Sequence, residues 1–407
     1  MSLLDKLIDK NEWIEYLNFK ENQSSISKEE LEELKLFVVE EKYKAIATSI
    51  INDTYTFSIP SKHLINKINK SKKRIVYSFN EEENYILKLI TYLFSKQYDN
   101  CYSKCCYSFR KVSGVKEAIK TITNKEDLNL LYGYKIDISN YFNSVDVKLL
   151  LEKLKGFLNE DLKLYNLIES ILKDDRTIFN DEIIHESKGI MAGVPISSFL
   201  ANMFLTDVDK YFEKEDVLYL RYSDDIIIFT EEYKINEYIK ILNSKITQNN
   251  LTINEDKKLY IKPGQKWDFL GFSFENGIID ISKVAKDKIK GKIKRSCRKL
   301  RRWMLKKNTE SNRAIRAVIR KFNRKFYMID NTRELTWSLW YFPVINTTEG
   351  LHEIDEYMQQ ELRYIATGKH NKKNYKITYE MLKEYGYKPL VSEYFRFKEN
   401  KKKEKII

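Results

Sequence analysis

Two adjacent aspartates, Asp224 and Asp225, stand between two apolar runs, and this pattern could hold a metal ion. Residues 217–220 and 226–229 are aliphatic or aromatic and predict two strands of a hairpin with the acids at its tip. Neighbouring carboxylates repel each other, so their display beside apolar strands favours a hard divalent cation. An ordinary Asp-containing turn is the other interpretation of this dipeptide alone.

A third acid follows a second predicted strand. Residues 134–137 end in Asp137 and lead through aromatic residues to Phe142. If the two strands are neighbours, Asp137 and Asp224 can share two Mg²⁺ ions about 4 Å apart. One ion would lower the pKa of an attacking 3′-hydroxyl, and the other would stabilise the triphosphate and the leaving pyrophosphate. This chemistry needs no general-base histidine, which suits a chain with 4 His.

The charge balance of the chain favours a polyanionic partner. The 407 residues include 72 Lys or Arg and 59 Asp or Glu, a formal net charge of +13. This excess is typical of proteins that bind nucleic acid or an anionic membrane, although a basic protein without a particular partner also fits it. No apolar run approaches the roughly 18 residues that predict a membrane span. The sequence therefore favours nucleic acid and no membrane.

The four cysteines do not form a zinc-binding pattern, because no CxxC pair is matched by a second pair. They are Cys101, Cys105, Cys106 and Cys297. The N-terminus lacks an apolar stretch of secretory length. Reduced thiols and a cytoplasmic location are therefore expected.

Most of the net charge is concentrated in one segment. Residues 283–307 carry thirteen Lys or Arg and one acid, Asp287, so the segment contributes 13 − 1 = +12. Apolar residues recur every three or four positions there, as on one face of a helix, and a second basic helix around 313–326 repeats the design. A solvated charged face is the alternative to a phosphate-binding surface. The candidate nucleic-acid-binding residues are Lys294, Arg295, Arg298, Arg301, Arg302, Arg316 and Arg320.

Five segments, taken in order, make the chain resemble the reverse transcriptases over about residues 57–275. They are Asp137-Ile-Ser-Asn-Tyr-Phe142, Gly189-Ile-Met-Ala-Gly193-Val-Pro195-Ile-Ser197, Tyr222-Ser-Asp-Asp225, Leu251-Thr-Ile-Asn-Glu-Asp-Lys257-Lys258 and Phe269-Leu-Gly271-Phe272. Each segment alone is a weak signal, whereas five in the right order at plausible spacing form a strong one.

The resemblance implies roles for the residues that match its motifs. Asp137 and Asp224 would be the main metal ligands, joined by the carbonyl of Ile138, with Asp225 completing the acidic cluster. Phe142 would be the steric gate that clashes with a ribose 2′-hydroxyl, which implies deoxynucleotide substrates. A core aromatic residue is the alternative for this phenylalanine. RNA-dependent RNA polymerases tend to carry a polar residue near this point.

Further residues would contact the nucleotide, the template or the primer. Gly193, Pro195 and Ser197 would shape the backbone under the incoming base, and Ala192 stands where the family pattern has Gln, which puts template handling in doubt. Lys257 or Lys258 would donate a proton to pyrophosphate, and Phe269, Leu270 and Gly271 would form the primer grip. In the segment Lys72-Lys73-Arg74, Lys73 and Arg74 would bind the triphosphate. In the segment Ser108-Phe-Arg110-Lys111, Arg110 would contact the template or the triphosphate. An ordinary surface residue is the alternative for each basic side chain.

The implied fold is α+β, a right-hand polymerase with fingers, a palm with an antiparallel sheet and a helical thumb, plus helical N- and C-terminal extensions. The expected domains are an N-terminal helical extension at 1–55, fingers at 56–132, palm at 133–280, and basic thumb with C-terminal extension at 281–407. No second nuclease constellation is recognisable, so RNase H or integrase activity is not expected.

The predicted function is RNA-directed DNA polymerase, with two Mg²⁺ ions, dNTPs, an RNA template and a DNA product. The tail from Trp337 to Tyr387 resembles the extension of prokaryotic antiphage-defence reverse transcriptases, which implies a dedicated noncoding RNA; retron enzymes are the nearest competitor. Two alternatives stay open: an untemplated or protein-primed DNA polymerase of abortive-infection type, and a non-catalytic RNA-binding module. The sequence leaves open the RNA, the primer and oligomerisation.

Overall fold

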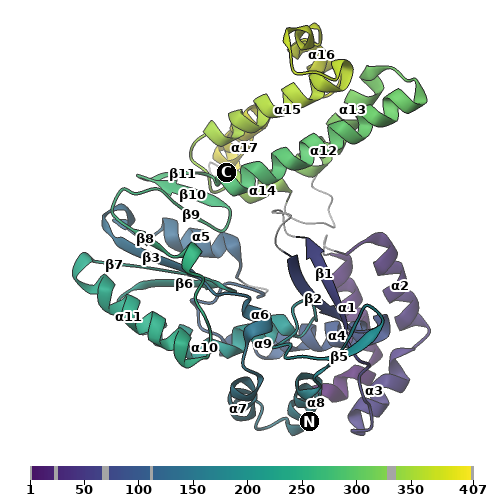
Figure 1. The fold of residues 1–407 in the computed structure, drawn as a ribbon, viewed down its shortest axis with the longest axis vertical. Coiled ribbons are helices and arrows are strands. Elements are labelled where there is room, and N and C mark those ends of the chain that lie inside the picture. Colours follow the sequence, from purple (N-terminus) through teal and green to yellow (C-terminus); the bar gives the residue numbers. More distant parts are fainter. Residues whose placement is uncertain (1, 23–25, 67–72, 111–112, 328–335, 405–407) are drawn as a thin grey trace. The chain divides into compact units, whose positions relative to one another are not determined.

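The computed structural model describes residues 2–22, 26–66, 73–110, 113–327 and 336–404. The chain divides into two compact units, Met1–Pro263 (unit 1) and Gly264–Ile407 (unit 2). Both units combine helices with mainly antiparallel strands, so the predicted α+β class is confirmed (Figure 1). The boundary between the units falls inside the range 133–280, for which a single palm domain was predicted.

Helices form the N-terminal part of unit 1, as the sequence predicts. They are η1 (Leu3–Ile8), α1 (Lys10–Glu21), α2 (Lys28–Val39) and α3 (Tyr43–Ile51). Trp13 of α1 lies at their centre with no exposed surface. Its indole Nε1 donates to the carbonyl of Leu7 at 2.8 Å, and its ring stacks on Tyr43 with centroids 4.9 Å apart. This aromatic contact joins η1, α1 and α3.

The N-terminal helices pack on α4 (Glu81–Gln97). Asn80 caps this helix by accepting from the backbone N–H of Glu83 at 2.9 Å, and three glutamates in the first turn favour its positive end. The helix buries apolar side chains on most of its circumference, including Ile86 and Leu89. Helix α4 is therefore a central element of unit 1.

A first sheet of unit 1 combines two hairpins. Its strands are β1 (Ser61–Asn66), β2 (Lys73–Ser78), β4 (Arg176–Phe179) and β5 (Glu182–His185). The strand order is β2-β1-β4-β5, with antiparallel pairing inside each hairpin and a parallel pairing of β1 with β4.

A second sheet carries the predicted acidic residues. Its strands are β3 (Tyr132–Asp137), β6 (Leu218–Tyr222), β7 (Asp225–Thr230) and β8 (Leu259–Ile261). The order is β6-β7-β3-β8 and every pairing is antiparallel. The three residues Ile226, Ile227 and Ile228 are fully buried, so both faces of β7 are covered.

The remaining elements of unit 1 are helices and short 3₁₀ turns, and some of the helices pack on the second sheet. The helices are α5 (Val115–Thr123), α6 (Tyr141–Ser144), α7 (Val147–Phe157), α8 (Leu162–Lys173), α9 (Ser197–Phe204), α10 (Thr206–Glu213) and α11 (Glu232–Gln248), with short 3₁₀ turns at Asp99–Cys101, Leu128–Leu130 and Glu255–Lys257. Helix α11 packs against β3 and β7, and α10 and α5 pack against β6.

Unit 2 begins with a three-stranded sheet and continues with helices. The strands are β9 (Trp267–Phe269), β10 (Phe272–Glu275) and β11 (Ile278–Ile281), in the order β11-β10-β9. The helices are α12 (Lys283–Lys307), α13 (Ser311–Tyr327), α14 (Trp337–Tyr341), α15 (Glu349–Thr367), α16 (Tyr379–Glu384) and α17 (Leu390–Glu404), with a 3₁₀ turn at Lys372–Lys376.

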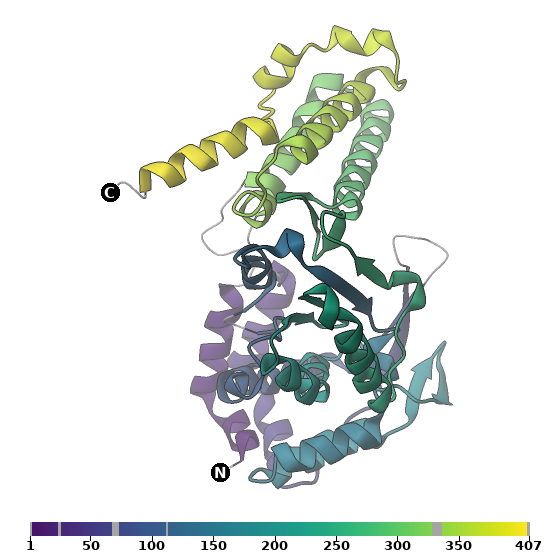
Figure 2. The same ribbon diagram turned by 90° about the vertical axis from the view of Figure 1, so that its left-hand side faces the viewer.

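The long helices α12, α13 and α15 lie side by side (Figure 1, Figure 2). The predicted apolar stripe of α12 is buried at Ile289, Ile293, Cys297 and Met304. Its cationic side chains lie on the other faces, as a 3.6-residue period requires. No helix in the described parts of the chain is long and apolar enough to cross a membrane.

We expect Gly133→Ala in β3 to destabilise unit 1. A Cβ at Gly133 would lie 2.5 Å from Cε1 of Phe229 on the neighbouring strand. Overpacking of a close-packed core costs about 1–3 kcal/mol. The measurement is the urea midpoint of unfolding followed by circular dichroism.

Gly156→Ala in α7 is the matched control, because a Cβ at Gly156 would meet no atom within 4 Å. Alanine in a helix is favoured over glycine by up to about 1 kcal/mol, so this variant should be as stable as the unmodified protein or slightly more stable. Equal midpoints for the two variants would contradict the packing argument.

Candidate active site

The paired aspartates lie at the tip of the hairpin formed by β6 and β7, as predicted. Tyr222 pairs with Asp225, which leaves Ser223 and Asp224 as a two-residue loop. Ser223 takes a left-handed backbone with φ of 60° although it is not glycine. Two-residue hairpin loops need positive φ to match the twist of their strands. The loop therefore holds a strained serine immediately before the acids.

The third acid is brought to the same place by strand pairing. Asp137 is the residue of β3 that pairs with Asp225 of β7. The backbone N–H of Ile138 donates to the carbonyl of Asp224 at 3.0 Å, which joins the end of β3 to the hairpin loop. The strands are thus neighbours, and Asp137, Asp224 and Asp225 lie at one end of the sheet.

Burial and mutual repulsion make this end of the sheet electrostatically unfavourable for carboxylates. Burial, aided by the charges of Asp224 and Asp137, raises the pKa of Asp225 to about 6, against a lowering effect of Lys135. Burial also raises the pKa of Asp224, and the charge of Asp137 adds to this effect. A raised pKa means that the ionised form is poorly compensated here. The cluster therefore favours a bound cation.

Lysine 257 supplies part of the missing positive charge. Its Nζ lies 2.5 Å from Oδ1 of Asp137, and Asn254 donates to Oδ2 of the same carboxylate at 3.4 Å. Lys258 instead pairs with Glu255 at 2.6 Å. Of the two predicted proton donors, the structure brings only Lys257 to the acidic cluster.

Phe142 lies in the short helix α6, which begins at Tyr141. The preceding residue, Asn140, has a positive φ of 49°. Its neighbour Tyr141 is the core aromatic residue, because its hydroxyl donates to the carbonyl of Ala201 at 2.6 Å and its side chain is buried. Phe142 is only half-buried. The ring of Phe109 meets Phe142 edge-on, with centroids 6.0 Å apart.

Phe109 was not among the predicted site residues. It is 49% exposed and has a positive φ of 56°. A non-glycine residue in this backbone region, next to a predicted functional residue, indicates a constrained position. The only signal in the sequence was its place directly before Arg110 in a predicted motif.

The loop 189–197 is held between α6 and β2. The carbonyl of Ala192 accepts from the backbone N–H of Tyr77 at 2.7 Å, and its N–H donates to Oδ1 of Asn143 at 2.9 Å. Gly193 has φ of 105°, and a Cβ there would lie 2.8 Å from the carbonyl of Tyr77, so glycine is required. Ser197 is buried and its hydroxyl donates to the carbonyl of Met191 at 2.8 Å, which closes the loop.

The predicted basic residues of the fingers have different surroundings. Lys73 and Arg74 are exposed on β2, and the charge of Arg74 lowers the pKa of Asp224 against the larger raising effect of burial. Arg110 is held in its own loop, where it donates to the carboxylate of Asp99 at 3.0 Å and to the carbonyl of Ser103 at 2.8 Å. The neighbouring Lys72 and Lys111 of these motifs lie outside the described residues.

A family model described as reverse transcriptase (RNA-dependent DNA polymerase) matches residues 65–274. The chain belongs to the reverse transcriptase family. This range includes all three aspartates and the sheet that carries them, and it includes the other sheet of unit 1 except for residues 61–64 of β1. A comparison with the curated proteins gave no match.

Solved telomerase structures resemble the chain at low identity. Apo telomerase from Candida tropicalis, truncated from the C-terminal domain, has a TM-score of 0.45 and 15% identity, covering 56% of this chain and 55% of that one. Telomerase from Candida albicans in complex with a TWJ fragment of telomeric RNA has a TM-score of 0.46 and 13% identity, covering 86% and 68%. The chain thus spans about half the length of the first of these structures.

The donor set of this reverse transcriptase domain fits a hard divalent ion. Among the described residues, no three carboxylate, imidazole or thiol side chains gather closely enough to hold an ion by themselves. Mg²⁺ is usually held by one or two carboxylates together with phosphate oxygens of a substrate. Carboxylates of Asp137 and Asp224 with the carbonyl of Ile138 are donors of this kind, and the raised pKa values show charge that a cation would compensate.

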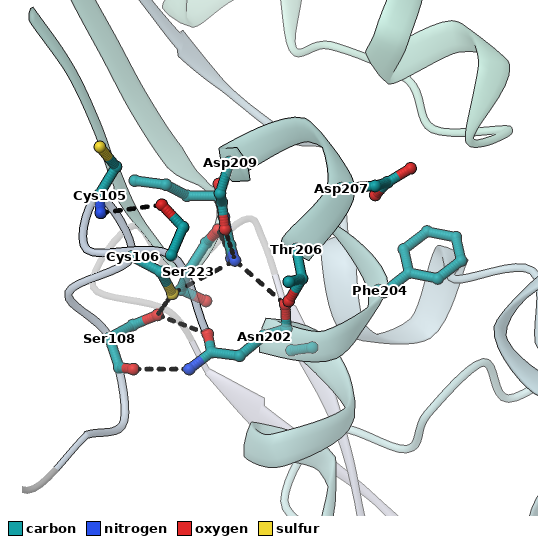
Figure 3. A network of polar contacts seen from close by, with 12 residues as sticks. Cys105, Cys106, Ser108, Asn202, Phe204, Thr206, Asp207, Asp209 and Ser223 are labelled. Atoms are coloured by element: carbon teal, nitrogen blue, oxygen red, sulfur yellow. Dashed lines mark hydrogen bonds and ion pairs between the residues drawn. The ribbon is translucent and has the colours of Figure 1, made fainter. Parts of the chain in front are cut away.

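A buried ion pair beneath the hairpin was not predicted (Figure 3). Arg221 of β6 and Asp209 of α10 are both fully buried. The guanidinium Nε and Nη2 donate to the two carboxylate oxygens of Asp209 at 2.8 and 2.5 Å, and Nη1 donates to the carbonyl of Ser223 at 3.3 Å. The pair therefore connects helix α10 directly to the loop that carries Asp224.

Further polar groups complete this network. Nη2 of Arg221 also donates to the carbonyl of Asn202 at 3.2 Å and contacts Sγ of Cys106 at 3.3 Å. The side chain of Asn202 in turn bonds Ser108, as Figure 3 shows. A charged residue inside an otherwise apolar strand was the available sequence signal for this network.

In unit 2, the predicted primer-grip residues form a tight turn. Phe269 of β9 is buried and pairs with Phe272 of β10. Leu270 and Gly271 between them have φ of 49° and 91°. Two consecutive positive φ values are typical of a two-residue hairpin turn.

Most of the predicted nucleic-acid-binding residues of unit 2 are exposed, namely Lys294, Arg295, Arg298, Arg302, Arg316 and Arg320. Arg301 is partly buried. Arg301 and Arg316 also make contacts within the unit.

Arg301 donates to the carbonyl of Ile365 at 2.6 Å, and the guanidinium of Arg316 lies over the ring of Tyr385 at 4.6 Å. A groove of about 300 Å³ between α12 and α13 is lined by cationic side chains, by Ser296 and by Phe322. The cations are Lys292, Arg295, Lys299, Lys321 and Lys325.

We expect Arg221→Met to destabilise unit 1 strongly. Removal of one partner leaves the carboxylate of Asp209 buried without its counter-charge, a loss of about 3–5 kcal/mol. The midpoint of thermal unfolding measures it. Lys234→Met is the control, because it breaks the pair with the 84% exposed Asp216. Similar midpoints for both variants would contradict a supporting role of the buried pair.

Proposed function

We propose that the protein is an RNA-directed DNA polymerase that adds deoxynucleotides to a 3′-hydroxyl with the help of two Mg²⁺ ions. The observation that carries the proposal is the pairing of Asp137 with Asp225 in neighbouring strands, with Asp224 beside them in the hairpin loop. A binding module has no use for buried, mutually repelling carboxylates, which supports catalysis over simple RNA binding. Membership in the reverse transcriptase family supports the choice of reaction.

In this proposal, Asp137 and Asp224 hold the metal ions with the carbonyl of Ile138, and Asp225 completes the acidic cluster. The bound ions would lower the pKa of the 3′-hydroxyl and offset the charge of the triphosphate. Lys257 would donate a proton to the leaving pyrophosphate, and the contact of its ammonium with Asp137 supports this role. Arg74 and Lys73 on the exposed end of β2 bind the triphosphate.

Selection of the substrate falls to the residues around Phe142. Its half-buried ring excludes a ribose 2′-hydroxyl, and Phe109 supports that ring from the side. The loop of Ala192 and Gly193 lies under the incoming base, with its backbone fixed by Tyr77 and Asn143. We infer that Arg110 contributes through the shape of its loop, because its guanidinium is engaged with Asp99 and two carbonyls.

Unit 2 is proposed to bind the phosphate backbone of the template–primer duplex. The groove between α12 and α13 is lined by five cationic side chains, a composition suited to phosphates. In the hand nomenclature of polymerases, we propose 56–132 as fingers, 133–280 as palm and 281–407 as thumb and extension. Leu270 and Gly271 would form the primer grip.

A noncoding RNA as template and a role in bacterial antiviral defence in the cytoplasm are finer proposals. They are supported by the resemblance of the tail from Trp337 to Tyr387 to the extension of prokaryotic antiphage-defence reverse transcriptases. One test separates templated synthesis on such an RNA from untemplated or protein-primed synthesis. That test uses protein purified from cells with its native neighbouring sequence and without nuclease treatment. The co-purifying RNA is sequenced, and Mg²⁺ with labelled dNTPs is then added.

Asp224→Asn should lower DNA synthesis in this assay by at least about 10²–10³-fold, because it removes a charge that stabilises the transition state through the metal. Affinity for the co-purifying RNA should stay within about twofold. Asp216→Asn is the control, since it makes the same chemical change at an exposed position before β6. Full activity of Asp224→Asn would overturn the catalytic assignment.

The sequence of the product decides between the finer proposals. DNA complementary to one enriched RNA supports templated synthesis on a dedicated partner. DNA that matches no RNA supports untemplated synthesis, and a DNA adduct that survives boiling in detergent supports protein priming. No DNA under any condition supports the RNA-binding module. Loss of phage resistance in cells with Asp224→Asn tests the defence role.

Phe142→Ala should lower discrimination against ribonucleotides by about 10–200-fold, the usual effect of removing an apolar contact that excludes one group. The measurement is the ratio of kcat/KM for a dNTP to that for the matching rNTP. Phe109→Ala should lower the ratio less, because its ring only supports Phe142. Tyr141→Phe is the control, since it removes a core hydroxyl and leaves the ring; unchanged discrimination in Phe142→Ala would exclude a gating role.

A further inference from the structure

An open groove of about 780 Å³ lies in unit 1 between helices α1 and α4 and two loops. Phe109 and Gly193 lie on the loops, while Phe19 and Tyr92 lie on the helices. Sites for small ligands commonly have volumes of about 300–1,000 Å³. Helix α1 lies outside residues 65–274 whereas α4 lies within them, so only the α1 side of this wall is an addition to the reverse transcriptase domain.

Aromatic rings dominate the helical wall. Tyr92 of α4 lies against Phe19 with centroids 4.9 Å apart and against Tyr16 with centroids 5.4 Å apart. The buried hydroxyl of Tyr16 has no hydrogen-bond partner among the described residues. Tyr16 also lines the groove. Phe109 adds an exposed ring from the opposite loop.

Two lysines bring positive charge to the same wall. Nζ of Lys20 lies 5.5 Å from the ring centroid of Tyr16 and 5.8 Å from that of Phe19. Lys88 lies over Tyr85 and pairs with Glu30 at 2.5 Å. Burial lowers the pKa of Lys20, and the charge of Lys88 lowers it further, so an anion in the groove would relieve this repulsion.

The loop wall connects the groove to the proposed active site. Gly193 and Pro195 belong to the loop that is placed under the incoming base, and the ring of Phe109 touches Phe142. A strand that leaves the templating position beside Gly193 therefore meets the aromatic wall of α1 and α4. Aromatic faces next to cations are the typical surface for unpaired nucleotides.

We propose that this groove binds unpaired bases of the RNA template before they are copied, by stacking on Phe19 and Phe109 with Lys20 near the phosphates. The inference rests on the proposed function, because it names the path of the template at that same site. Stacking is tolerant of sequence, since every base has an aromatic face. Helix α1 thereby adds a template-holding surface to the reverse transcriptase domain.

The test uses three duplexes of an RNA template with a labelled DNA primer. Their template overhangs are one nucleotide, eight adenosines, and eight abasic ribose phosphates that keep the charge and lack the bases. Fluorescence anisotropy without dNTPs gives the Kd of each duplex. For the unmodified protein, the overhang of eight adenosines should lower Kd by about tenfold relative to the one-nucleotide overhang. The abasic overhang should lower Kd by a much smaller factor.

Two variants address the groove. Phe19→Ala/Lys20→Gln should lose most of the tenfold gain, and Phe19→Leu should lose a large part of it while keeping an apolar side chain against Tyr92. Tyr233→Ala/Lys240→Gln is the matched control, because it removes an aromatic and a cationic side chain from exposed positions on α11. The control should keep the gain.

Three results would overturn the inference: no gain from the adenosine overhang, an equal gain from the abasic overhang, or an unchanged gain in both groove variants. Extension of the one-nucleotide duplex by the unmodified protein tests the proposed function separately. Absence of extension with Mg²⁺ and dNTPs would count against polymerase activity, whereas the affinities are measured without catalysis and test the groove itself.

Discussion

The buried pair of Arg221 and Asp209 is the interaction on which the geometry of the acidic cluster depends. Both side chains are removed from water, and an isolated charge in such a place would be highly unfavourable. The pair is tolerable because the guanidinium is satisfied by the carboxylate, two carbonyls and a thiol. One of these carbonyls belongs to Ser223, whose φ is positive. The hydrogen bond from the buried guanidinium of Arg221 to the carbonyl of Ser223 thus holds the strained loop before Asp224 in place.

The acidic cluster itself opposes folding. The pKa of Asp225 is higher in the folded protein than that of an ordinary aspartate, so at neutral pH its ionised form destabilises the native state. Strand pairing nevertheless forces Asp137 and Asp225 together, and the ion pair with Lys257 offsets part of the repulsion. Apolar packing of β7 and the buried pair of Arg221 and Asp209 hold the three carboxylates together, although their mutual repulsion alone would separate them. This conflict between local repulsion and global packing is typical of functional sites.

Features that depend on neighbours in the sequence could be predicted. The hairpin with Asp224 and Asp225, the strand that ends in Asp137 and the apolar stripe of α12 follow from periodicities of two and 3.6 residues. Contacts between distant segments could not be predicted in this way. Phe109 and Phe142, or Arg221 and Asp209, meet only because the sheet and its helices fold around them. Arg301 and Arg316 show the same limit, since a single helix pattern cannot reveal that Ile365 and Tyr385 engage them.

The two proposed surfaces for nucleic acid, one in each unit, differ in composition. The groove of unit 2 presents cations almost alone, so its binding should be strong at low salt and should fall steeply as salt competes for phosphates. The groove of unit 1 presents rings with a few cations, so its binding should depend on the bases and much less on salt. Cationic side chains bind the phosphate backbone equally well at every nucleotide, so they give affinity but do not hold a particular base in place. Aromatic side chains stack on individual bases. A polymerase that copies one nucleotide at a time needs the second property at its active site, and the aromatic wall lies in the unit that holds the aspartates.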